Sequence, residues 1–136
     1  MRWKLGGLLA SLGLLCSMMT LAAHHSFTLE YDARKPITLK GVVTKVEWTN
    51  PHARFYIDVA DEKGTVTNWN LELASPSALV RNGWTSRSLK IGDRVTVEGF
   101  GARATGTHRV NARSVVLADG RSVFSGTADD GVPSGR

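Results

Sequence analysis

Three histidines are the residues whose type and placement most clearly suggest chemistry. His24 and His25 are adjacent near the start of the chain, and His52 directly follows Pro51 in a short polar corner. Proline fixes its own backbone and restricts the residue before it, so the chain is expected to turn where His52 sits. Imidazole is the commonest metal ligand in proteins. The three histidines are therefore a candidate metal site, provided that folding brings them together.

The residues before His24 have the order of a secretory signal peptide. Arg2 and Lys4 form a charged start, residues 5–19 contain a short apolar core, and Leu21-Ala22-Ala23 offers small residues for cleavage. Residues 1–23 are therefore predicted to be removed on export to the periplasm or the medium of a bacterium. An uncleaved anchor is the alternative, which the shortness of the apolar run disfavours.

Cleavage would create a new amino terminus with metal-binding groups of its own. After a cut behind Ala23, the free amine and the Nδ1 of His24 chelate one ion, and His52 is the natural third ligand. After a cut behind Ala22, His25 becomes the third residue, and amine, two amides and imidazole make a square-planar set without His52. Such nitrogen sets suit Cu(II), so copper is the expected metal. In the alternative interpretation, His24 and His25 only flank the cleavage site and His52 is a turn residue.

A second, weaker candidate site is a polar surface for an organic ligand. Residues on alternate positions of two expected strands would share an outer face, as antiparallel sheets with one solvated side often show. An ordinary solvated face explains the same pattern and is favoured. The residues concerned are Trp48, Asn50, Arg54, Tyr56, Asn68, Asn70 and Glu72.

Catalysis is not expected. The only cysteine, Cys16, lies in the segment predicted to be removed. The chain has no serine in a GxSxG turn and no glycine-rich phosphate loop that opens a helix. Zinc is disfavoured too, because no spaced set of cysteine and histidine is present.

The charge of the mature chain is mild. Of the 17 lysines and arginines, Arg2 and Lys4 lie in the predicted leader, which leaves 15 against 12 acidic residues. The basic residues are scattered singly, without the basic stripe that nucleic-acid binding needs. We therefore expect no nucleic-acid partner, and no membrane attachment of the mature form.

The apolar pattern predicts an all-β domain with one short helix. We expect an extended arm over residues 24–36, a barrel domain over 37–124 and a disordered tail over 125–136. A change of parity next to Gly41 predicts a β-bulge in the first strand. Ser75-Pro76 is a helix start and Asn82-Gly83 a helix stop. Strands are expected at 37–48, 53–59, 65–73, 94–99 and 110–117, with a brief one at 122–124.

Three strands, a short helix and two further strands form the order of an OB-fold, a five-stranded partly open barrel. A β-sandwich is the alternative, but five strands are few for it and the helix has no place there. The expected core includes Ala53, Phe55, Ile57 and Val59 on the second strand, and Trp69, Leu71, Leu73 and Trp84 further on.

Four runs of the sequence resemble an uncharacterised family of bacterial exported proteins, a domain of unknown function. They are HHSF, YDARKPITLKGVVTKVEWTNPHARFYIDV, WNLELASPSALVRNGW and SLKIGDRVTVEGF. The resemblance extends from His24 to about Gly120 and brings no reaction with it.

Two functions of different classes remain. One is an exported module that binds copper through His24, His25 and His52. The other is a metal-free OB-fold module that binds a protein, glycan or small ligand of the cell envelope. The position of His52 relative to the new terminus discriminates between them.

Overall fold

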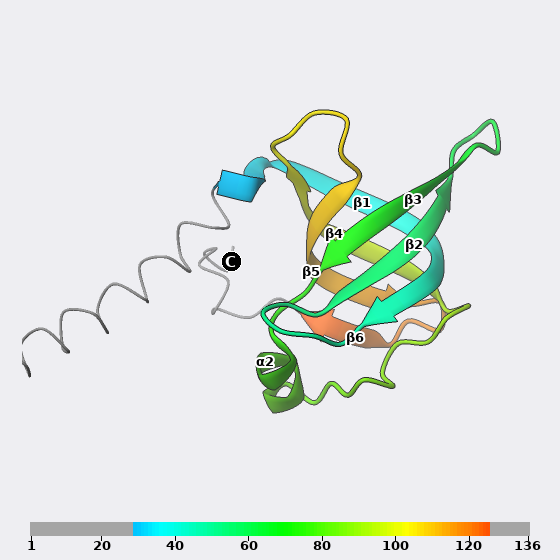
Figure 1. Ribbon diagram of the computed structural model, residues 1–136. Helices are drawn as coiled ribbons and strands as arrows, with labels where there is room; N and C mark the ends of the chain where they lie inside the picture. The colour runs from blue at the N-terminus through cyan, green and yellow to red at the C-terminus, as the bar shows by residue number, and fades with distance from the viewer. Residues whose placement is uncertain (1–28, 126–136) are drawn as a thin grey trace, which may run out of the picture.

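The computed structural model describes residues 29–125 and shows a small β-barrel with one helix at one end (Figure 1). The predicted signal peptide, His24, His25 and the tail beyond residue 125 lie outside the described residues. Between Leu29 and Ser125, no helix has the length and apolar run needed to cross a bilayer. The elements are β1 (Tyr31–Glu47), β2 (Arg54–Ala60), β3 (Val66–Glu72), α2 (Pro76–Arg81), β4 (Arg94–Ala102), β5 (Arg109–Leu117) and β6 (Ser122–Ser125).

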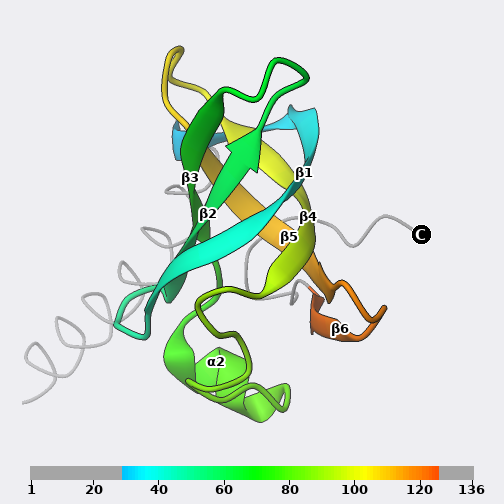
Figure 2. The same ribbon diagram turned by 90° about the vertical axis from the view of Figure 1, so that its right-hand side faces the viewer.

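The strands close into a ring, which Figure 2 shows from the side. Their order is β3-β2-β1-β4-β5-β6, and an additional pairing of β3 with β5 joins the two ends. That closing pair is parallel, with Leu71 beside Val110, whereas the other pairs are antiparallel. With α2 between β3 and β4, this is the OB-fold topology. The predicted fold class is confirmed.

β1 is shared between two neighbours. Val42 pairs with Asp58 of β2 and also with Arg94 of β4. The register with β2 shifts between Val43 and Lys45, which is the bulge that the change of parity predicted. β1 therefore bends enough to leave one neighbour and continue along the other.

The first strand begins earlier than expected, because β1 starts at Tyr31 rather than at Ile37. Tyr31 pairs with Ala102, and Pro36 pairs with Phe100, with a register shift between the two. The pattern around Pro36 indicated a break, since proline cannot donate to a ladder. The irregularity between Tyr31 and Pro36 accommodates it. β4 correspondingly continues to Ala102, beyond the end expected at residue 99.

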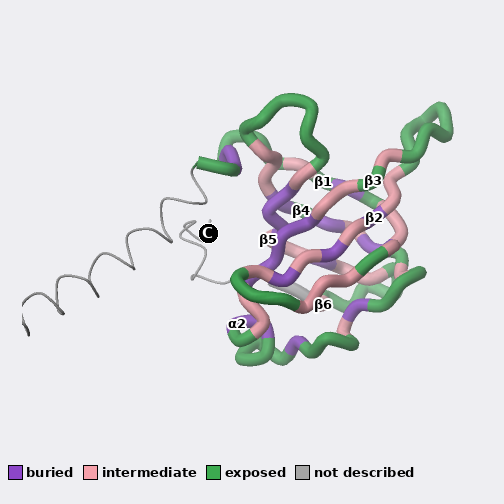
Figure 3. The backbone as a smooth tube through the Cα atoms, viewed as in Figure 1, coloured by how far each residue is buried: buried purple, intermediate pink, exposed green. Residues whose placement is uncertain are grey.

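The core fills the inside of the barrel (Figure 3). Phe55, Ile57 and Leu71 are completely buried, together with Val97 and Val110 from the other side of the ring. Ala53, Leu73 and Trp84 are buried as expected. Val59 and Trp69 are only partly buried, but both pack against the core cluster.

Helix α2 is delimited by its caps. The Ser75 hydroxyl accepts the backbone N–H of Ala78 at 3.3 Å, and Pro76 occupies the first turn, where its missing N–H costs nothing. Gly83 follows with a φ of 85°, the left-handed conformation that ends helices. The buried Leu79 attaches α2 to one end of the barrel, beside the loop between β1 and β2 (Figure 1).

Gly41 is required by close approach and not by a left-handed backbone. Its φ is not among the positive values of the described glycines. A Cβ at Gly41 would lie 2.5 Å from the carbonyl oxygen of Asp58 and 3.1 Å from Cγ2 of Val59. The two strands can therefore approach only where β1 has no side chain.

We predict that Gly41→Ala destabilises the fold by about 1–3 kcal/mol, the usual scale of overpacking. Gly101→Ala is the matched control in a strand, because its Cβ would meet nothing nearer than 3.8 Å. Thermal unfolding of both variants beside the wild type measures the difference. Equal midpoints for Gly41→Ala and wild type would show that the close approach carries no stability.

Candidate functional site

Most residues of the predicted polar site gather on the outer face of β2 and β3. The pairing places Arg54 opposite Glu72, Tyr56 opposite Asn70, and Asp58 opposite Asn68. The alternation of each strand therefore puts these side chains on one face, as expected.

The side chains of this face bond to one another in two groups, one around Asn68 and one around Asn70. The Asn68 amide donates to Asp58 Oδ1 at 2.7 Å and to Thr44 Oγ1 at 3.1 Å. The Asn70 amide lies 3.4 Å from the Tyr56 hydroxyl, which in turn donates to Glu47 Oε2 at 3.1 Å. A ligand on this face would therefore exchange existing hydrogen bonds for new ones, which lowers the net gain.

The Tyr56 ring is also occupied on one side. The Lys45 ammonium lies 5.2 Å from the ring centroid, within the range of a cation–π contact. Lys45 also pairs with Glu47 at 2.5 Å, and that hydrogen bond raises the pKa of the Lys45 amine. The face thus offers polar groups and little free aromatic surface.

Glu72 corrects the prediction that it points into solvent. Its side chain has a relative exposure of only 9%. The Glu72 carboxylate receives the Arg54 guanidinium at 2.6 Å and the Tyr31 hydroxyl at 3.0 Å, and Arg109 Nη2 lies 3.8 Å from it. A buried carboxylate persists only with such partners. Strand parity gave the direction of Glu72 correctly, but the start of β1 covers it.

Tyr31 connects this buried carboxylate to the start of the described chain. Its side chain is almost fully buried, and Arg109 lies 5.7 Å from its ring centroid. Burial, and then the negative charge of Glu72, raise the pKa of the Tyr31 hydroxyl. Tyr31 therefore stays protonated and keeps its proton available for Glu72. Its hydrogen bond to Glu72 attaches the start of β1 to the end of β3.

The residue before Tyr31 is held by the loop between β4 and β5. The backbone N–H of Arg103 donates to the Glu30 carbonyl at 2.9 Å, and Arg109 Nη2 donates to Glu30 Oε2 at 2.9 Å. The start of the described chain therefore lies beside residues 103–108, towards the barrel end opposite α2 (Figures 1 and 2). His108 belongs to this loop, and its ring meets the edge of Trp69 with centroids 5.0 Å apart.

Asp32 also helps to attach the start of β1 to the loop between β4 and β5. Its carboxylate accepts the backbone N–H of Arg34 at 3.0 Å, and Arg103 lies 3.8 Å from its other oxygen. The backbone hydrogen bond from Arg34, followed by the side-chain bond, lowers the pKa of Asp32. A lowered carboxyl pKa contributes stability at neutral pH that is lost as pH falls through the folded-state pKa.

His52 lies at the other end of the barrel, in the loop between β1 and β2. Its Nδ1 is 3.1 Å from the carbonyl oxygen of Leu73. A carbonyl only accepts, so Nδ1 carries the proton and the neutral ring keeps its lone pair on Nε2. Metal-binding histidines are commonly oriented in this way, by an N–H donated to a backbone carbonyl. The same bond also fits a turn residue that joins two loops.

Trp48 and Asn50, the other two residues of the predicted polar site, do not lie on the face of β2 and β3. Trp48 is partly buried and packs against the core, while Asn50 is exposed in the loop before His52. Across residues 29–125, no group of three or more histidine, cysteine, aspartate or glutamate side chains is placed to hold a metal. His24 and His25 precede those residues, so a site that includes them stays a prediction.

Sequence reasoning expected Tyr31 to attach the arm to the domain, but missed its contact with Glu72, as well as Arg109 and Asp32. The partners of Tyr31 and Arg109 lie far along the chain, with Tyr31 and Glu72 separated by 41 positions. The spacing of residues in the sequence cannot predict a contact over such a separation. The proximity of Asp32 and Arg34 was a usable signal, since an aspartate often binds the backbone N–H two residues on.

The closed ring, the short helix and the polar outer face define an OB-fold protein. The chain belongs to a family of unknown function (DUF6152), whose model matches residues 11–111. No curated protein matches the chain. One similar solved structure is a mitochondrial single-stranded DNA-binding protein of S. cerevisiae, with 15% identity and a TM-score of 0.48 over 68% of this chain and 97% of that chain.

We predict that Glu72→Gln lowers the free energy of unfolding by about 1–3 kcal/mol, because Arg54 and Arg109 lose a largely buried counter-charge. Glu98→Gln is the matched control on an exposed strand position, with an expected change below about 0.5 kcal/mol. Urea unfolding of both variants measures the difference. A Glu72→Gln protein as stable as Glu98→Gln would mean that the cluster does not anchor the start of β1.

Proposed function

We propose that the mature chain is an exported, non-catalytic binding protein whose ligand is one Cu(II) ion. The ion would be held by the processed amino terminus, through His24 or His25, together with His52. The proposal rests on the sequence order of residues 1–25 and on one structural observation. Nδ1 of His52 bonds the Leu73 carbonyl, so Nε2 is the nitrogen free to coordinate.

The histidine set has a clear chemical logic. Cu(II) favours tetragonal nitrogen coordination, and an amine with its own imidazole supplies two of the ligands. The ligands must be deprotonated, so copper affinity falls as pH drops through the histidine range, near about 6.5. The matching family model begins at residue 11 and so includes His24 and His25.

Calorimetric titration of Cu(II) into tag-free exported protein, whose first residue is read by intact mass, tests the proposal. We expect a start at His24 or Ala23 and one ion per chain, with binding abolished by a long amino-terminal tag. His52→Ala should weaken binding of the His24-started form by more than about tenfold, since even outer-shell changes reach that scale. An Ala23-started form should be nearly unaffected.

His108→Ala is the matched control, because it removes a different exposed imidazole. If His108→Ala weakens binding and His52→Ala does not, the third ligand lies in the loop that holds Glu30. Equal weak binding by the tagged and tag-free proteins would reject the copper site. Full-length protein found only in membranes would reject export.

A second candidate is a metal-free module that binds a glycan or another polar ligand of the cell envelope. One observation favours it, namely that the polar side chains of β2 and β3 lie together on an outer OB-fold face. This face and the adjacent loops are where OB barrels bind oligomers. In this second candidate, the same face could instead bind a protein or a small molecule of the envelope.

Soluble peptidoglycan oligosaccharides are a direct probe of the second candidate. We expect the side-chain amide NMR signals of Asn68 and Asn70 to shift on titration. The Asn82 amide, which donates to the Ala78 carbonyl at 2.8 Å in α2, should stay in place and serves as the internal control. Unchanged Asn68 and Asn70 signals at millimolar sugar would remove glycan binding from this face.

A further inference from the structure

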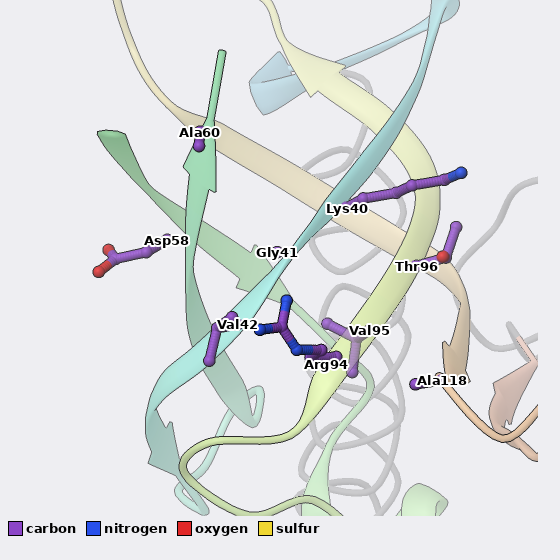
Figure 4. A pocket seen from close by; sticks show the side chains of 9 residues that line it. All are labelled: Lys40, Gly41, Val42, Asp58, Ala60, Arg94, Val95, Thr96 and Ala118. Carbon is purple, nitrogen blue, oxygen red and sulfur yellow. The ribbon is translucent and has the colours of Figure 1, made fainter. Parts of the chain in front are cut away.

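A recess on the outside of the barrel is lined by neither His52 nor His108. It has a volume of about 330 Å³ and sits where β1, β2 and β4 meet (Figure 4). The shared strand β1 explains it. Val42 pairs with both neighbours, but before Val42 β1 follows β4, so the end of β2 at Ala60 diverges from it.

Gly41 keeps the recess open at its floor. A side chain there would collide with the backbone of Asp58, so the position between Lys40 and Val42 stays bare. The nearby walls contain short apolar side chains, Val42, Ala60 and Ala118. A hollow of this size is at the lower end of small-molecule sites, which run from about 300 Å³ upward.

The positive side chains at the recess outnumber the negative one. In Figure 4 the Arg94 guanidinium lies beside Val42 and Gly41, while the Asp58 carboxylate points away from them. That carboxylate accepts the Asn68 amide at 2.7 Å on the polar face. Lys40 adds a second positive charge on another wall, and Thr96 adds a hydroxyl. The recess is therefore positive, with one guanidinium directed over small apolar groups.

We propose that this recess binds a small organic anion, with a carboxylate on Arg94 and a short aliphatic body against Val42, Ala60 and Ala118. The planar guanidinium matches a carboxylate with two parallel hydrogen bonds. The apolar walls would bury the aliphatic body of such a ligand, which stabilises binding; an inorganic anion has no apolar surface to bury. The site is independent of the proposed copper ligands and lies beside the polar face of β2 and β3.

Hexanoate is a suitable probe, and NMR titration of the tag-free mature protein follows the backbone amides of Gly41, Ala60 and Thr96. We expect saturable shifts with hexanoate, weaker ones with acetate, and none with inorganic phosphate or hexylammonium at equal concentration. Because the guanidinium is exposed, high salt should weaken binding. Phosphate binding equal to hexanoate would overturn the assignment of an organic ligand.

Two variants test the recess in different ways. Arg94→Ala removes the charge and should lower hexanoate affinity about tenfold, the equivalent of one charge-assisted hydrogen bond. Ala60→Leu keeps the charge and fills the recess, so it should lower affinity similarly. Arg87→Ala is the matched control, since Arg87 is an exposed arginine outside the recess.

Folding of each variant is checked by its amide spectrum before titration. Loss in Arg94→Ala and Ala60→Leu with full affinity in Arg87→Ala supports the site. Equal loss in Arg87→Ala and Arg94→Ala would mean general attraction to a basic protein. Full affinity in Ala60→Leu would place the aliphatic body elsewhere and overturn the proposal.

Discussion

The close approach of β1 and β2 at Gly41 is the constraint on which the barrel depends. β1 pairs with β4 up to Val42 and with β2 from Val42 onward, and this change of partner falls next to Gly41, which has no side chain to hold the strands apart. A Cβ at Gly41 would lie 2.5 Å from the Asp58 carbonyl oxygen, closer than the 3.0 Å that Cβ atoms keep from non-bonded heavy atoms. Closure of the ring, the direction of β4 and the divergence of β2 all follow from this contact.

The parallel pairing of β3 with β5 closes the other side of the ring, and a buried charge marks this junction. Glu72 is the last residue of β3, and Arg109 is the first of β5. Tyr31 reaches the same carboxylate from β1. Tyr31, Arg54 and Arg109 come from three different strands and all meet Oε2 of this one buried carboxylate. We infer that this cluster fixes where the amino-terminal segment leaves the barrel.

Much of the fold could be predicted because its signals are local. The change of parity beside Gly41 predicted the bulge, and Ser75-Pro76 with Asn82-Gly83 predicted both ends of the helix. The order of strands and helix then selected one topology. The alternation of β2 and β3 also grouped Arg54, Tyr56, Asn68 and Asn70 correctly on one face.

What alternation cannot predict is whether an outward side chain meets water. Glu72 and Asn68 have the same parity on β3, yet Glu72 is buried and Asn68 is exposed. The difference comes from Tyr31, which belongs to a segment whose proline suggested that the sheet had not yet begun. The recess at Arg94 escaped for a related reason, because its walls come from three strands whose divergence depends on register.

His52 and the start of the described chain lie in different regions of the barrel surface. His52 is fixed by a carbonyl beside α2, whereas Glu30 is held by the loop between β4 and β5. A terminus that starts at His24 must therefore cross from one region to the other to use His52. Glu30 lies six positions after His24, and an extended chain over six positions spans about 20 Å. The use of His52 therefore requires an extended path between the two regions. The ordering entropy of that path opposes the gain from the third ligand. His108, on the loop that already holds Glu30, would need a shorter path.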